Sequence, residues 1–261
     1  MLPRRDLLLG CRHPVQLNPV VETAETALRT WEPCWTAFLD GAVREEACER
    51  LGNLAELELH GDGGYPGAER QRLLILRRET GLNPVSIDTP LTGVQINGNF
   101  LFDPAEPEDL RLVLVEAGLQ VGAIGDVWLR GDRGGQAVVS SEASAHLDGW
   151  RGQVRTVEVH LEVCPLSSLQ PPARRLPRRL QTVEASCRLD AVASAGFGLS
   201  RNRMGELIRA GQVRVNWKPI TSSSHPLSQG DRIHLQDRGE VEVEGITITK
   251  RDRWRLELLR R

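Results

Sequence analysis

The sequence predicts an α+β protein built from three successive regions. Helical spacing of apolar residues dominates residues 1–80, and strand-like alternation mixed with helical segments follows in residues 81–170. Two amphipathic helices and several short strands are expected in residues 181–261. The segment 171–180 is rich in proline and arginine and is predicted to be an extended basic linker. With 261 residues, the chain is long enough for several domains with cores of their own.

The first region is predicted to be mainly helical. Pro19 would lie in the first turn of one helix, and Asp40 would cap another helix over residues 41–51. Apolar and polar residues alternate over residues 57–60, which predicts a strand. The apolar run at residues 73–76 fits a strand or a buried helix equally well.

The middle region has the element order β-α-β-β-α-β, which predicts a ferredoxin-like (RRM-like) domain with helices on an antiparallel sheet. Two strand-like segments, at residues 85–87 and 94–97, precede the helix at 106–117; strands follow at 126–130 and 136–140, then a helix at 142–147 and a last strand at 154–163. The aromatic motifs with which RRM sheets stack RNA bases are absent. Base stacking on this sheet is therefore not expected.

Charge is distributed unevenly along the chain, although the formal net charge is only −2. Residues 172–261 contain 18 Arg and Lys against 10 Asp and Glu, whereas residues 1–171 contain 15 against 25. The C-terminal part is thus basic and the rest is acidic. This asymmetry favours a nucleic-acid-binding C-terminal end.

The strongest pattern lies in residues 188–236. Ser200 would cap the second of two helices, and Gly211 would end it. Apolar and polar residues alternate from 213 to 218, which predicts one strand with a cationic outer face. The turn Gly230-Asp231 would precede a further strand, and residues 240–261 would add a strand pair to the same sheet.

This stretch resembles the S4 RNA-binding domain. The matching residues are Arg188-Leu189-Asp190, Ser200-Arg201, Leu207-Ile208, Gly211, Val213-Arg214-Val215-Asn216 and Gly230-Asp231. The resemblance implies a surface for structured RNA. The RNA contacts that it implies are Arg188, Ser200, Arg201, Arg203, Arg214, Asn216 and Lys218.

Two further motifs extend the resemblance to YlmH-type S4 proteins. They are the segment from Gly64 to Arg70 and the pair Gly125-Asp126. Residues 104–110 depart from these relatives, so RNA contacts by the helix that begins there are not expected. The whole arrangement resembles the S4 proteins of cyanobacteria that are named after photosystem II. The resemblance implies that the partner is ribosomal RNA or tRNA, with the ribosome as a candidate.

Signatures of catalysis are missing from the sequence. The loop at residues 61–67 is rich in glycine but fits neither a dinucleotide fingerprint nor a P-loop. The Asp190 motif superficially resembles that of pseudouridine synthases but lacks the residues that follow it there. We therefore expect a non-catalytic RNA-binding protein without metal or cofactor. The open alternatives are an RNA-modifying or processing enzyme with an unrecognised active site, and a protein-assembly factor linked to photosystem II.

The cysteines and the apolar runs indicate in which cellular compartment the protein is expected. The five cysteines are odd in number and form no Cys-x-x-Cys pair, so neither a disulfide framework nor a zinc site is indicated. A reducing cytoplasm is expected. No apolar run approaches the roughly 18 residues that a membrane span needs, so membrane insertion is not expected.

Overall fold

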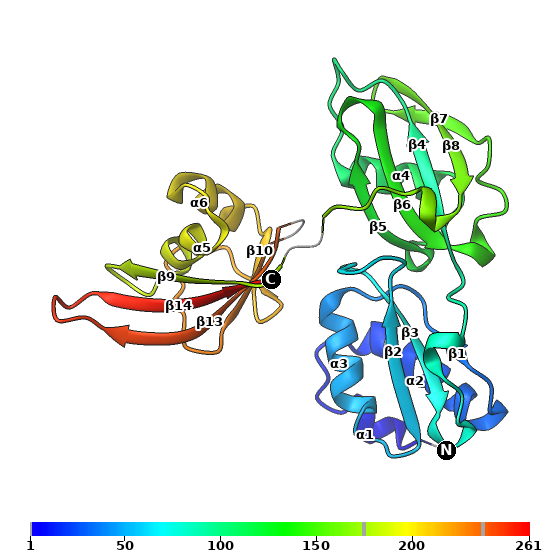
Figure 1. Cartoon of the computed structure of the whole chain (residues 1–261), viewed down its shortest axis with the longest axis horizontal. Coiled ribbons are helices and arrows are strands. Elements are labelled where there is room, and N and C mark those ends of the chain that lie inside the picture. Colours follow the sequence, from blue (N-terminus) through cyan, green and yellow to red (C-terminus); the bar gives the residue numbers. More distant parts are fainter. Residues whose placement is uncertain (1, 174–175, 236–237) are drawn as a thin grey trace. The chain divides into compact units, whose positions relative to one another are not determined.

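A computed structural model describes residues 2–173, 176–235 and 238–261 (Figure 1). The chain divides into two compact units, Met1–Ala173 and Arg174–Arg261. The predicted boundary between residues 80 and 81 lies within the first unit and stays a prediction. Of the predicted linker, Arg174 and Arg175 lie outside the described residues, and its last residues already belong to strand β9 (Arg178–Glu184).

The N-terminal part of the first unit packs helices on a three-stranded sheet of order β1-β3-β2. Its elements are α1 (Arg4–Leu8), α2 (Pro14–Thr30), β1 (Cys34–Trp35), α3 (Gly41–Leu51), β2 (Leu57–Asp62) and β3 (Arg72–Arg77). The apolar run at residues 73–76, for which a strand and a buried helix were equally compatible with the sequence, is a buried strand. Helix α2 begins at Pro14, so Pro19 lies inside the helix and not in its first turn as predicted.

Helix α3 begins where its sequence predicts. The side chain of Asp40 accepts a hydrogen bond from the backbone N–H of Val43 at 2.9 Å, which satisfies one free donor of the first turn. From within this helix, the buried carboxylate of Glu46 accepts hydrogen bonds from the backbone N–H groups of Arg12 and His13, at 2.6 and 3.0 Å. Glu46 thereby fastens the start of α2 to α3.

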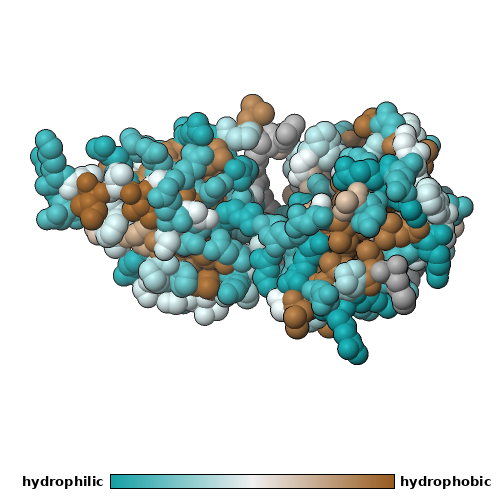
Figure 2. All heavy atoms as spheres, turned by 90° about the horizontal axis from the view of Figure 1, so that it is seen from below, coloured by the Kyte–Doolittle hydropathy of each residue, from teal (hydrophilic) through white to brown (hydrophobic). Residues whose placement is uncertain are grey.

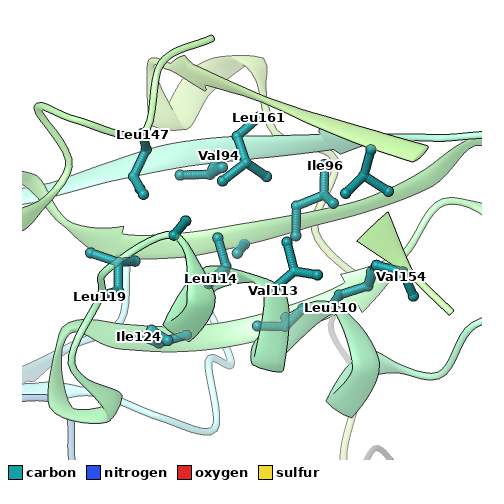
Figure 3. Packing of buried hydrophobic residues seen from close by; sticks show 14 of the residues in the cluster. Val94, Ile96, Leu110, Val113, Leu114, Leu119, Ile124, Leu147, Val154 and Leu161 are labelled. Atoms are coloured by element: carbon teal, nitrogen blue, oxygen red, sulfur yellow. The ribbon is translucent and has the colours of Figure 1, made fainter. Parts of the chain in front are cut away.

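The middle part is a five-stranded antiparallel sheet of order β5-β6-β4-β8-β7, with helix α4 on one face. Its elements are β4 (Leu91–Asn97), α4 (Pro107–Glu116), β5 (Ile124–Leu129), β6 (Gly134–Ser140), β7 (Arg151–Val154) and β8 (Val157–Cys164). The order β5-β6-β4-β8 is that of a ferredoxin-like sheet, as predicted. Leu110, Val113 and Leu114 of α4 point toward the apolar side chains of the sheet (Figure 3).

Two predicted elements of this part are wrong, and a third begins later than expected. Residues 85–87 are not a strand, because Asn83 accepts a hydrogen bond from Val85 and starts a 3₁₀ turn over Pro84–Ser86. The helix expected at 142–147 is a single 3₁₀ turn, Ser141–Ala143, and β7 follows it as an added edge strand. The last strand expected at 154–163 is present as β8 but begins at Val157, because the chain reverses at Arg155, where φ is 53°, out of the preceding strand β7.

The other face of this sheet is covered, in part, by the N-terminal part of the unit. Phe38 packs there with Trp128, Val138 and Leu169. A Cβ on Gly125 would lie only 2.7 Å from the Phe38 ring, so this position needs glycine. An RRM leaves this face of its sheet open to RNA, and here the covered part is unavailable for base stacking.

Asp126 ties the glycine-rich loop to the sheet. Its carboxylate accepts hydrogen bonds from the Tyr65 hydroxyl and the Glu69 N–H, both at 2.7 Å, and from the Arg70 N–H at 2.9 Å. Arg70 also donates from Nε to the carbonyl of Ile124 at 3.0 Å. The two YlmH-type motifs, from Gly64 to Arg70 and at Gly125-Asp126, therefore meet in one junction.

The second unit is a six-stranded antiparallel sheet of order β11-β10-β12-β13-β14-β9, with two helices packed on one face. Its remaining elements are α5 (Leu189–Phe197), α6 (Arg201–Arg209), β10 (Val213–Val215), β11 (Lys218–Pro219), β12 (Arg232–Leu235), β13 (Gly239–Ile248) and β14 (Trp254–Arg260). Apolar residues of α5, α6 and the sheet form one core. The protein is thus a mixed α+β structure, as predicted.

Candidate nucleic-acid interface

The two helices of the second unit follow Arg188 and Ser200, and the second of these starts is the one that the sequence predicts. Arg188 is the N-cap residue of α5, and Ser200 caps α6 by accepting a hydrogen bond from the Arg203 N–H at 3.2 Å. Gly211, with a φ of 72°, follows α6 in the left-handed conformation that ends many helices. The exposed start of α6 therefore presents arginine side chains beside free backbone N–H groups, an arrangement that attracts anions.

Three of the predicted RNA contacts are already ion-paired. Arg188 lies 3.1 Å from Asp190, Arg201 lies 2.5 Å from Glu184, and Arg203 lies 2.9 Å from Glu206. The arginines are all exposed, so a phosphate can reach them. Each carboxylate nevertheless cancels part of the charge that would attract it. A phosphate at these positions has to compete with a neighbouring acid.

The strand predicted over residues 213–218 is wrong, because the chain reverses within it. Asn216 and Trp217 have φ values of 48° and 66°, and they form the two-residue turn between β10 and β11. Two-residue turns with positive φ at both positions suit the twist of antiparallel strands, and Asn is among the residues that tolerate them. The apolar alternation of Val213, Val215 and Trp217 fits one continuous strand equally well, so the turn is not visible in it.

The turn changes which way the predicted contacts face. Lys218 pairs with Val215, and Arg214 pairs with Pro219. Directly opposed residues share a face of an antiparallel sheet, so Lys218 lies on the face that packs against the helices and Arg214 on the other. The sequence expectation of one shared cationic face for Arg214, Asn216 and Lys218 is therefore wrong.

Asn216 has a structural task in this turn. Its side-chain amide donates to Asp231 at 2.8 Å, and its side-chain oxygen accepts from the Arg232 N–H at 3.0 Å. These bonds join the 216–217 turn to the Gly230-Asp231 turn beside it. Any RNA contact by Asn216 stays a prediction.

The structure thus brings together only part of the predicted site. Ser200, Arg201 and Arg203 gather at the start of α6, and Lys218 lies on the same side of the sheet as the helices. In the part of the chain that the structure describes, Arg214 and Lys218 have no side-chain hydrogen bond or ion pair. Their roles in RNA binding are untested and stay predictions.

Within the described ranges, no three His, Cys, Asp or Glu side chains gather closely enough to hold a metal ion. No helix in the described part of the chain is both long and apolar enough to cross a bilayer. Burial raises the pKa of the Cys34, Cys164 and Cys187 thiols, so these cysteines stay protonated and weakly nucleophilic at neutral pH.

The family comparisons agree with this geometry. The S4 domain model matches residues 187–233, which span α5, α6, β10, β11 and the start of β12. The second unit contains an S4 domain. The model named "YlmH, N-terminal" matches residues 13–80, so the expected pairing of a YlmH-type N-terminal part with a C-terminal S4 domain is confirmed.

Two known proteins resemble the chain over most of their own length. The Ribosome-associated protein quality control protein P2 of Bacillus subtilis (strain 168) is 29% identical over 225 residues, which cover 85% of this chain and 84% of the relative. The solved structure of the Cell division protein ylmH from Streptococcus pneumoniae covers 61% of this chain and 94% of its own, with a TM-score of 0.48 and 15% identity.

Proposed function

We propose that the chain is a non-catalytic protein that binds structured RNA through its S4 domain. The observation that carries the proposal is the S4 match at residues 187–233, in which the start of α6 presents exposed arginines and free N–H groups. The excess of basic residues in the second unit supports it, because RNA binding depends strongly on charge. Recognition by such a surface reads backbone shape and phosphate position.

We further propose that the RNA is ribosomal RNA or tRNA and that the protein works on the ribosome in the cytoplasm. The printed name of the Bacillus subtilis relative, with its ribosome association, supports this partner. A link to photosystem II rests on the sequence resemblance alone, and no described residue adds support to it. That the protein works without catalysis rests on the missing sequence motifs.

The test of RNA binding uses two surface variants of equal charge change. Arg203→Gln with Lys218→Gln removes two predicted contacts without leaving a buried carboxylate unpaired, since the Glu206 partner of Arg203 is 56% exposed. Arg5→Gln with Arg29→Gln is the control, because both arginines are exposed in the first unit. Sedimentation with purified ribosomes and fluorescence anisotropy with labelled tRNA would measure binding.

The first variant should weaken binding and the control should not. Each lost phosphate contact should flatten the log–log salt dependence by about 0.7 to 0.9, so two should flatten it by about 1.4 to 1.8. Equal binding and equal slopes for wild type and both variants would contradict the proposed surface. Turnover of RNA, detected as an altered nucleoside or a cleaved strand after incubation, would contradict the non-catalytic proposal.

A further inference from the structure

A second basic surface lies at the end of the β13–β14 hairpin, which we call the hairpin arm (residues 247–255). It contains Lys250, Arg251, Arg253 and Arg255 against the single acid Asp252. The hairpin reaches one end of the six-stranded sheet, beyond helices α5 and α6 (Figure 1). At this end of the unit, hydrophilic side chains protrude beside apolar ones (Figure 2).

The cations of the hairpin arm differ from those at α6 in their pairing. Among the described residues, the side chains of Lys250, Arg251, Arg253 and Arg255 have neither an acidic partner nor a side-chain hydrogen bond. Arg188, Arg201 and Arg203 each have a carboxylate nearby. A phosphate that approaches the arm therefore displaces only water and counterions, which favours binding.

The tip of the arm is an ordered turn. Thr249 donates from its N–H to the carbonyl of Arg253 at 2.7 Å, and the N–H of Arg253 donates to the Thr249 hydroxyl at 3.2 Å. Asp252 takes the left-handed conformation with a φ of 51°, which Asp tolerates better than most residues. Because the backbone is held, Lys250, Arg251 and Arg253 extend from a defined support.

The hairpin arm contains one aromatic residue, Trp254, directly after its turn. Trp254 is partly exposed and alternates with the buried Leu256, so it lies on the face of the sheet that packs against the helices. It pairs with Ile248 on one side, which is 64% exposed, and with Glu184 on the other. Glu184 also forms the ion pair with Arg201, so the strand register places Trp254 beside a residue that contacts the first residue of α6.

We propose that the hairpin arm binds an unpaired stretch of RNA next to the structured RNA held at α6. Proteins hold single-stranded nucleic acid with cations placed along the phosphate backbone and with aromatic rings on which the bases stack. Lys250, Arg251 and Arg253 bind phosphates, and Trp254 stacks on a base. This inference rests on the proposed function and extends it to a second, single-stranded element of the same RNA.

The first experiment compares two RNA probes. One is a blunt, fluorescein-labelled RNA hairpin, and the other is the same hairpin with an unpaired 3′ extension of about ten nucleotides. Arg251→Gln with Arg253→Gln should weaken binding of the extended probe more than that of the blunt probe. It should also flatten the salt dependence for the extended probe by about 1.4. The charge-matched control, Arg5→Gln with Arg29→Gln, should behave as wild type on both probes.

The second experiment separates stacking from packing at Trp254. Trp254→Phe keeps an aromatic face, whereas Trp254→Leu keeps only apolar bulk. The Leu variant should bind the extended probe roughly 5- to 100-fold more weakly, and the Phe variant should stay much closer to wild type. Circular dichroism and thermal melting establish that both are folded. Equal binding by the Leu variant and wild type would overturn the stacking role.

The outcomes distinguish this inference from the proposed function. If Arg203→Gln with Lys218→Gln weakens binding and Arg251→Gln with Arg253→Gln does not, the arm is no RNA contact although the S4 surface is one. If wild type binds neither probe and no ribosomal RNA, both proposals fail. Vesicles of phosphatidylglycerol and phosphatidylcholine provide the last comparison. Vesicle binding that the arm variant loses, with RNA binding unchanged, would make the arm a membrane-surface element and overturn the inference.

Discussion

Replacing Asp126 by Ala should loosen the junction between the glycine-rich loop and the middle sheet. One carboxylate accepts three hydrogen bonds there, from the Tyr65 hydroxyl and from the N–H groups of Glu69 and Arg70, at 2.7 to 2.9 Å. Alanine offers no acceptor, so all three donors lose their partner. The guanidinium of Arg70 stays in place beside them, where burial and the charge of Arg111 already lower its pKa.

The size of the effect follows from these bonds. A hydrogen bond to a charged group contributes about 1.5 to 3 kcal/mol to stability. Three such bonds would set an upper range of about 4.5 to 9 kcal/mol, but Asp126 is only partly buried and water can replace some of them. We therefore expect Asp126→Ala to lower the free energy of unfolding by about 3 to 5 kcal/mol. Tyr65→Phe, which keeps the ring against Trp128 at 5.6 Å, should lower it by only about 1 kcal/mol.

Urea unfolding gives the change in free energy, and hydrogen–deuterium exchange locates it. The amides of Glu69 and Arg70 should exchange much faster in Asp126→Ala than in wild type, because their N–H groups lose their acceptor. The Tyr65→Phe variant should leave the exchange of both amides nearly unchanged. If Asp126→Ala lowered the free energy of unfolding by less than about 1 kcal/mol and the amides of residues 69 and 70 stayed protected, Asp126 would not be the residue that holds the loop to the sheet.

Two further outcomes are expected. Burial alone would raise the pKa of Glu46, but hydrogen bonds from Arg12 and His13 and the charge of Arg12 outweigh it and hold the pKa below the ordinary 4.5. The charged form therefore stabilises the fold above the ordinary pKa, and this contribution is lost as the pH falls through the lower folded value. Glu46→Gln should cost about 2 kcal/mol at pH 7 and reduce the slope of stability against pH below about pH 5, as measured by urea unfolding across that range. Asn216→Ala should cost about 2 to 3 kcal/mol, and Asn216→Gly less because glycine tolerates the positive φ, as measured by thermal melting. A Gly variant as stable as wild type that fails to bind RNA would show instead that Asn216 acts by direct contact.

Short-range signals in the sequence predicted much of the fold. Asp40 and Ser200 mark helix starts through their own side chains, within three residues of the donors that they satisfy. The order of strands around α4 followed from their sequence alone, because a hairpin and one crossover leave few ways to arrange the sheet. Each of these signals depends on neighbours in the chain.

The failures arose where a distant partner or a turn decided the outcome. Alternation from Val213 to Lys218 is the same in one strand as in two strands joined by a two-residue turn, so the faces of Arg214 and Lys218 could not be read from it. The ion pair between Arg201 and Glu184 joins residues 17 positions apart. The sequence also did not show that the arm cations lack acidic partners among the described residues, since this depends on which acids the fold places beside them. Their charge was visible in the sequence, but their availability was not.

The position of β14 between β13 and β9 sets an order of events during synthesis. Strand β9 pairs with β14 along its whole length, from Arg178 opposite Arg260 to Glu184 opposite Trp254. A ribosome that adds about 5 to 20 residues each second makes β14 roughly 4 to 15 seconds after β9. During that interval β9 has no strand to pair with, whereas all strands of the first unit have already been made. The first unit can thus complete its sheets co-translationally, and the sheet of the second unit closes only when β14 arrives.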